Sequence, residues 1–117
     1  MHRLHELQVY RKALLFTKRV RETTKTFPKN EVYGLTIQFQ RAADSVALNI
    51  AEGAGNRSKK EFARFLDYSI RSSYECRGCL DIAKENHFIE EHVYGSLHEQ
   101  VREIVAMLHG LQTSLRN

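Results

Sequence analysis

Apolar residues recur along most of the chain at steps of three and four, which is the spacing of a helix buried on one side. Breaks at residues 27–30, 53–58 and 86–88 divide the pattern into four segments. No stretch alternates polar and apolar residues between turns as a strand would. The pattern therefore predicts an all-α fold, an antiparallel up-down-up-down four-helix bundle, as a single domain over residues 1–117.

Each segment contains its own predicted core stripe. The core positions are Val9, Ala13, Phe16, Val20 and Phe27 in residues 7–26 and just beyond, Leu35, Phe39, Ala42, Val46 and Ile50 in residues 31–52, Phe62, Leu66, Ser69, Ser73, Cys76, Leu80 and Ala83 in the third segment, and Val93, Leu97, Val101, Ile104, Leu108, Leu111 and Leu115 in the fourth. Small residues at the middle of the third stripe, opposite small residues of the second segment, predict that these two helices pack closely. Asn30 is expected to cap the second helix, and Ser58 with Glu61 forms a predicted capping box.

The second segment is apolar on nearly all sides. Between Tyr33 and Ala51 only Arg41 and Asp44 are charged, although one face of a helix in a monomeric bundle should be polar. This pattern predicts a homo-oligomer in which a second copy covers the outer face. The predicted interface residues are Ile37, Arg41, Ser45, Leu48 and Glu52. The alternatives are that the aliphatic residues are ordinary surface scatter and that the polar residues are hydrogen-bonded within one bundle.

Basic residues are concentrated at the start of the chain. Residues 1–29 contain eight basic and two acidic side chains, although the net charge of the whole chain is only +4. On a helical wheel, Arg11, Lys18, Lys25 and Lys29 lie opposite the core stripe, flanked by other cations. Such a face can neutralise phosphates, and without a base-reading signature any binding should have little sequence specificity. The alternative is a solvated face that keeps the protein soluble.

The break between the second and third segments combines glycines with cations. Residues 53–60 superficially resemble a phosphate-binding loop at a helix N-terminus, but they lack its G-K-[ST] ending and the preceding strand. The alternative is that the glycines end one helix and Ser58 caps the next. The predicted nucleic-acid-binding residues, RNA or DNA, are Arg11, Lys12, Lys18, Arg19, Lys25, Lys29, Arg57, Lys59 and Lys60.

No pattern in the sequence favours catalysis or a cofactor. Cys76 and Cys79 match the C-x-x-C spacing of redox and zinc sites, but they lie in the middle of a predicted helix without a second ligand pair, so a packing role is expected. None of the six histidines follows a glutamate at the Glu-x-x-His spacing of di-iron bundles. We expect a protein that is not an enzyme and that has neither a metal nor another cofactor.

Nothing in the sequence predicts export or a membrane anchor. Glu6 lies where a signal peptide needs an apolar run, and the longest uncharged stretch, residues 104–115, is shorter than the roughly 20 residues that span a bilayer. The expected location is therefore the cytoplasm, without a membrane partner.

Several short motifs together resemble one known family. The motifs are Tyr10-Arg11-Lys12-Ala13, Phe27-Pro28, Tyr33-Gly34-Leu35-Thr36, Gln38, Arg41-Ala42-Ala43, Asn49-Ile50-Ala51-Glu52-Gly53, Arg57-Ser58, Glu61-Phe62 and Phe65-Leu66. They resemble the bacterial four-helix bundle proteins, also called 23S ribosomal RNA intervening-sequence proteins. The resemblance implies a cytosolic homopentamer of four-helix bundles and gives no catalytic residues. Similar bundles act as accessory proteins of diversity-generating retroelements, where a basic pentamer binds nucleic acid and a reverse transcriptase.

The sequence departs from the family pattern at three positions. Ala47 replaces a common proline, Arg71 a common glycine and Cys76 a common leucine. The combined prediction is a non-catalytic homo-oligomer, a pentamer by resemblance, that binds RNA or DNA through its first helix and the turn at residues 57–60. The alternative is a protein-interaction scaffold whose basic face meets an unidentified acidic protein.

Overall fold

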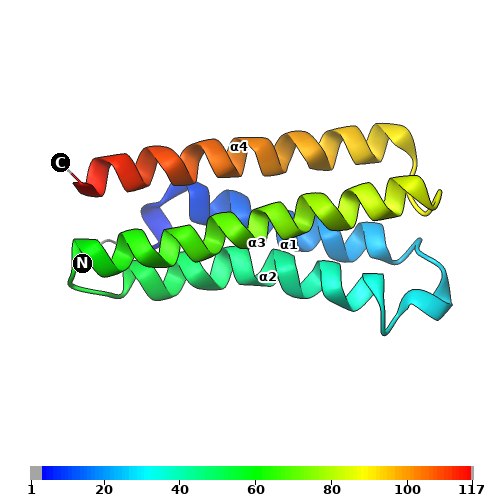
Figure 1. Ribbon diagram of the computed structural model, residues 1–117, viewed down its shortest axis with the longest axis horizontal. Helices are drawn as coiled ribbons and strands as arrows, with labels where there is room; N and C mark the ends of the chain where they lie inside the picture. Colours follow the sequence, from blue (N-terminus) through cyan, green and yellow to red (C-terminus); the bar gives the residue numbers. More distant parts are fainter. Residues whose placement is uncertain (1–3, 117) are drawn as a thin grey trace.

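Four long amphipathic helices make up the structure (Figure 1). The computed structural model describes residues 4–116, apart from the side chain of Glu6. The helices are α1 (Gln8–Thr24), α2 (Leu35–Ala54), α3 (Lys59–Glu85) and α4 (Glu91–Arg116), with 3₁₀ turns at Leu4–Glu6 and Lys29–Glu31. The described part of the chain contains no strand, so the all-α prediction is confirmed.

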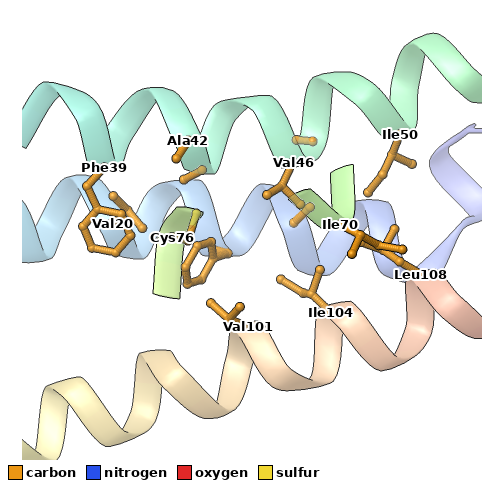
Figure 2. Close-up of a cluster of buried hydrophobic side chains, with 14 of the residues drawn as sticks. Val20, Phe39, Ala42, Val46, Ile50, Ile70, Cys76, Val101, Ile104 and Leu108 are labelled. Carbon is orange, nitrogen blue, oxygen red and sulfur yellow. The ribbon is translucent and has the colours of Figure 1, made fainter. Parts of the chain in front are cut away.

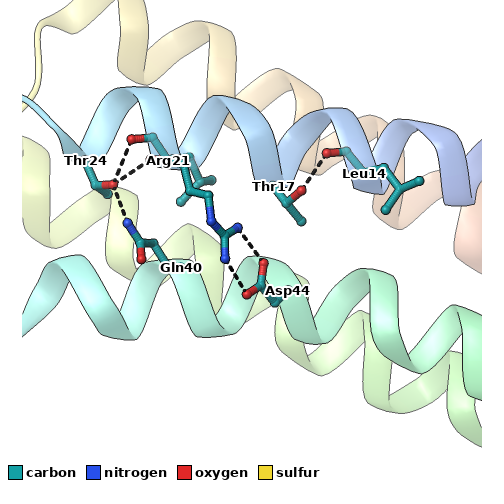
Figure 3. Close-up of polar contacts among 7 residues, drawn as sticks. Leu14, Thr17, Arg21, Thr24, Gln40 and Asp44 are labelled. Atoms are coloured by element: carbon teal, nitrogen blue, oxygen red, sulfur yellow. Dashed lines mark hydrogen bonds and ion pairs between the residues drawn. The ribbon is translucent and has the colours of Figure 1, made fainter.

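Side-chain contacts show that each helix runs antiparallel to the next. The Arg21 guanidinium of α1 binds Asp44 of α2, and one turn later Thr24 meets Gln40 (Figure 3). The α1–α2 and α3–α4 connections consequently lie at one end of the bundle, and the α2–α3 turn lies at the other (Figure 1). α1 and α3 each pack on both α2 and α4. In cross-section, α1 therefore lies diagonally opposite α3.

The core fills the space between the four helices along their whole length. Phe16 of α1 and Phe39 of α2 are fully buried and meet edge to face, with ring centroids 6.3 Å apart. Figure 2 shows side chains of α2 and α4 converging with the Cys76 sulfur of α3 between them. Nearly all the predicted core positions are buried, and only Val93 and Leu111 are half-buried.

The close packing of α2 and α3 follows from their small residues. The hydroxyl of Ser69 donates to the carbonyl oxygen of Val46 at 2.8 Å, and the hydroxyls of Ser72 and Ser45 are 2.8 Å apart. The glycines end α2 as the alternative for residues 53–58 predicted: Gly53 lies in the last turn and Gly55 is the C-cap, both with negative φ, and Ser58 caps α3. The role of Gly53 is packing, because a Cβ there would come within 3.0 Å of two phenylalanines of α3.

The connections differ from the sequence prediction in detail. Asn30 does not cap α2, because the chain first makes the 3₁₀ turn and a bend, so α2 begins only at Leu35, whose amide donates to the Glu31 carboxylate at 3.2 Å. Half of the predicted capping box forms: Ser58 Oγ accepts from the Glu61 amide at 3.2 Å, while the Glu61 carboxylate pairs with an arginine of α3.

The end of α3 is held by a residue with left-handed backbone. His87 has φ 59°, the conformation that glycine usually supplies at this position. The Phe88 amide donates to the carbonyl oxygen of Ala83 at 2.8 Å, and the His87 amide donates to that of Lys84 at 3.1 Å. These two bonds form a Schellman motif, which ends the helix and turns the chain toward α4.

Candidate nucleic-acid interface

Three predicted phosphate-binding residues form a row on the outer face of α1. Arg11, Lys18 and Lys25 are exposed and lie seven residues apart, so they project from the same side of the helix. At 1.5 Å per residue, neighbouring members of this row are about 10 Å apart along the helix axis. Lys29 continues the row into the α1–α2 connection and is also exposed. We call these four residues the α1 cation row.

The members of the α1 cation row have no carboxylate partner among the described residues. The only acidic residue of α1 is Glu22, and it lines a separate groove beside Arg19 and the α3–α4 connection. A guanidinium or ammonium group that no carboxylate neutralises remains available to an anion from solution. The row therefore has the position and the charge needed to bind phosphates.

The other cations of α1 have partners on the neighbouring helices, at the surface of the bundle. The Lys12 ammonium pairs with Glu103 of α4, and the Arg19 guanidinium donates to Ser96 Oγ at 2.7 Å and to Gln100 Oε1 at 3.0 Å. Arg21 makes two hydrogen bonds to the Asp44 carboxylate, at 2.7 and 2.8 Å (Figure 3). The structure therefore separates Lys12 and Arg19 from the row with which the sequence grouped them.

Arg57, Lys59 and Lys60 lie outside α1, in the α2–α3 turn and the first turn of α3. Arg57 lies in the α2–α3 turn, at the opposite end of the bundle from Lys25 and Lys29. Lys59 and Lys60 begin α3 and line a groove against the end of α4, where two carboxylates also contribute to the lining. Lys25 and Lys29 thus lie at one end of the bundle and Arg57, Lys59 and Lys60 at the other, and Glu22 is the one acidic residue within a helical turn of Lys18 and Lys25 on α1.

The sequence analysis missed a set of cation–aromatic contacts on α3. The Arg64 guanidinium lies 5.7 Å from the ring centre of Tyr68, Arg71 lies 5.9 Å from the same ring, and Arg77 lies 5.4 Å from Tyr74. The signal in the sequence was the spacing of three and four between arginine and tyrosine, which places them side by side on a helix. These contacts engage the α3 arginines within the chain.

The residues predicted for an oligomer interface on α2 differ in their exposure in the single chain. Leu48 is 63% exposed, Arg41 and Glu52 are exposed, and Ile37 is half-buried. Ser45, in contrast, is hydrogen-bonded within the bundle, because its hydroxyl binds the Ser72 hydroxyl and accepts from the Asn49 amide at 3.0 Å. For that residue the structure favours the alternative of an internal polar contact. At the start of the same region Tyr33 is 93% exposed.

The two cysteines are free and buried in the core. Burial raises the pKa of both thiols, that of Cys79 to about 11, so both are protonated at neutral pH. Among the described residues no group of three or more His, Cys, Asp or Glu side chains could hold a metal ion. No helix in the described part of the chain is both long and apolar enough to cross a bilayer.

Comparison with known proteins identifies the family. Residues 5–110 match the family described as 23S rRNA-intervening sequence protein, which covers most of the chain. The chain belongs to this family. The sequence resemblance to the 23S rRNA-intervening sequence proteins is thus confirmed.

A solved structure shows the same fold as this member of the 23S rRNA-intervening sequence protein family. It is a crystal structure of a protein of unknown function from the S23 ribosomal protein family of Bacteroides thetaiotaomicron. The two chains are 20% identical, with a TM-score of 0.80 over 89% of this chain and 97% of the other. No functionally curated protein matches the sequence.

Proposed function

We propose that this protein is a non-catalytic, homo-oligomeric nucleic-acid-binding protein that contacts the phosphate backbone through the α1 cation row. The supporting observation is the division of the α1 cations. Lys12, Arg19 and Arg21 have partners on the bundle surface, while Arg11, Lys18, Lys25 and Lys29 face solvent without a carboxylate partner among the described residues.

Phosphate binding by this row is expected to depend on salt more than on sequence. Each lysine or arginine that neutralises a phosphate releases counterions, so affinity falls as salt rises. The cations of the row are single point contacts on one helix face, and such contacts fix position on the backbone without reading bases. The expected ligand is therefore RNA or DNA of any sequence that can lie along α1.

Self-association through α2 would strengthen this binding. Leu48 and Tyr33 are largely exposed, and covering them against a second copy removes apolar surface from water. The family resemblance implies a pentamer. Each copy then presents its own α1 cation row, and simultaneous engagement of several rows raises the avidity of a weak contact.

The test compares two double variants that change the net charge equally. K18Q/K25Q removes two members of the α1 cation row, and K84Q/R102Q removes two exposed cations that pair with Glu91 and Glu99. With structured RNA or duplex DNA at about 50 mM salt, we expect the first variant to bind roughly tenfold more weakly and the second to bind like the wild type. Equal weakening of both variants, or no wild-type binding, would refute the proposal.

One observation favours a protein-interaction scaffold as the second candidate. Leu14 and Leu15 are 42% and 61% exposed and lie among the same cations, where they line a shallow groove with Gln8, Arg11 and Lys12. A partner with acidic and apolar side chains would match this combination. The substitution Leu15→Ser separates the two functions, because phosphate binding needs no apolar contact and should keep its wild-type affinity.

A further inference from the structure

An apolar groove lies at the end of the α1 cation row. It is formed where α1 ends, by the following connection and by the first turns of α2, and its volume is about 600 Å³. The lining residues are Arg21, Thr24, Lys25, Phe27, Pro28, Lys29, Val32, Thr36 and Gln40. A volume of this order is typical of sites that take small organic groups. No carboxylate is among the lining residues.

The walls of this groove, here called the Phe27 groove, are held in place. The Phe27 ring is almost buried and packs against Phe88 of the α3–α4 connection, with ring centroids 5.9 Å apart. The side-chain amide nitrogen of Gln40 donates to Thr24 Oγ1 at 3.0 Å, and the Thr24 hydroxyl donates to the Val20 carbonyl at 2.8 Å. This chain of bonds orients the Gln40 amide and leaves its carbonyl oxygen available as an acceptor.

Charge at the rim of the Phe27 groove favours an anionic ligand. Lys25 and Lys29 line the groove and have no carboxylate partner among the described residues. Arg21 also lines it, but its guanidinium is neutralised by Asp44, so it acts as a wall (Figure 3). A ligand that matches the site has an apolar group for the groove and negative charges for the two lysines.

We infer that the Phe27 groove binds one unpaired nucleobase of a single strand that lies along α1, with the flanking phosphates on Lys25 and Lys29. This inference rests on the proposed function. A nucleobase has flat apolar faces and a polar edge that can donate to the Gln40 carbonyl oxygen, and in a strand it is always flanked by phosphates. Bases in a duplex are stacked inside and cannot enter a side groove without being extruded, so the site selects single strands.

The test uses three probes with the same strand length, namely a twelve-nucleotide deoxyadenosine strand, its duplex and an abasic strand. The abasic strand keeps the phosphates and lacks the bases, so it isolates the contribution of the groove. Because a base in the groove removes apolar surface from water, at about 25 cal/mol for each Å², burial of roughly 60 Å² should make the wild type bind the deoxyadenosine strand about tenfold tighter than the abasic strand. The duplex should bind no tighter than the abasic strand.

Two variants alter the groove without changing charge. Val32→Ser removes an apolar wall, and Thr36→Phe fills the groove from the other side. Both should bind the deoxyadenosine strand within about twofold of the abasic strand, whose affinity stays at the wild-type value. Ile82→Ser is the matched control, because Ile82 and Val32 are each 50% exposed and Ile82 lies on α3, away from the groove. Thermal unfolding checks that each variant folds.

The outcomes separate this inference from the proposed function. If the wild type binds the deoxyadenosine and abasic strands equally well, the groove does not bind a base. The proposal that the α1 cation row binds phosphates is then unaffected. Full affinity of both groove variants for the deoxyadenosine strand refutes the groove as a base site as well. If none of the probes binds at about 50 mM salt, both proposals fail. Tighter binding of an acidic peptide containing phenylalanine than of any strand assigns the groove to a protein ligand and also overturns the inference.

Discussion

Replacing Gly53 with alanine should destabilise the protein, although alanine is the better helix former. Gly53 lies in the last turn of α2, where a Cβ would be 2.8 Å from Cδ1 of Phe62 and 2.9 Å from Cβ of Phe65. Phe62 is 1% exposed, so its ring has little room to move, and the Cβ of Phe65 is fixed to the backbone of α3. The new methyl group can fit only if the two helices separate.

The two opposing effects can be compared in magnitude. Alanine in place of glycine inside a helix is favourable by about 0.5–1 kcal/mol, and an inserted methyl group in a close-packed site costs about 1–3 kcal/mol. For Gly53→Ala the packing cost is larger, so the free energy of unfolding should fall by about 1–2 kcal/mol. At Gly78 of α3 no atom lies within 4 Å of the added Cβ. Gly78→Ala should therefore raise the free energy of unfolding by about 0.5–1 kcal/mol.

Thermal and urea unfolding of both variants, followed by circular dichroism at one protein concentration, measure the two effects. A change of 1 kcal/mol shifts the melting temperature of a domain of this size by about 4 °C. We expect Gly53→Ala to melt lower than the wild type and Gly78→Ala to melt higher. If Gly53→Ala is as stabilising as Gly78→Ala, then the claim that α2 and α3 pack closely at Gly53 is wrong.

Three further predictions follow from the geometry. Leu48→Glu should dissociate the oligomer in analytical ultracentrifugation while keeping its helical circular dichroism, because Leu48 is exposed in the single chain; a wild type that is already monomeric would contradict this. His87→Gly should raise the free energy of unfolding by about 0.5–1 kcal/mol in urea titrations, because glycine adopts the left-handed backbone without strain, and a lower stability would contradict it. Burial raises the pKa of the Cys79 thiol from its ordinary value of 9.0 to about 11, so the folded state holds this proton over a range in which the unfolded chain releases it. Stability should therefore fall as pH rises from about 9 to 11, with a smaller fall in Cys79→Ala, and an equal fall in both proteins would count against this cause.

The fold could be predicted from the sequence because the local signals agree with each other. The stripe from Phe62 to Ala83 keeps steps of three and four, and it is buried as the spacing requires. The end of α3 was also visible in the sequence, at residues 86–88. In these places periodicity, capping and packing favour the same structure.

The start of α2 could not be predicted from local signals alone. Asn30 has the chemistry of a cap, but the 3₁₀ turn that follows Pro28 places it outside α2. The glycines correctly predicted the end of α2, but the close packing of Gly53 against two phenylalanines of α3 had no local signal. The start of α2 is therefore set by the turn after Pro28, and the packing of Gly53 is set by a contact with another helix.

The sequence predicted which face of the first helix is basic. It did not predict which cations of that helix have partners within the bundle. The helical wheel places Arg11, Lys18 and Lys25 opposite the core, and the structure has them exposed. The helical wheel cannot show that Lys12 and Arg19 bind α4, because their partners are about 80–90 residues away in sequence. The sequence likewise did not predict the Phe27 groove, because its walls come from the end of α1, the connection and the start of α2.

The salt dependence of nucleic-acid binding tests the central proposal most directly. The logarithm of the affinity for duplex DNA, plotted against the logarithm of the salt concentration, has a slope of about −0.9 for each neutralised phosphate. Wild type and K84Q/R102Q should give the same steep slope, and K18Q/K25Q should give a slope that is shallower by about 2 for each α1 cation row engaged. A slope unchanged by K18Q/K25Q, or no binding at low salt, would contradict a phosphate-binding role for the α1 cation row.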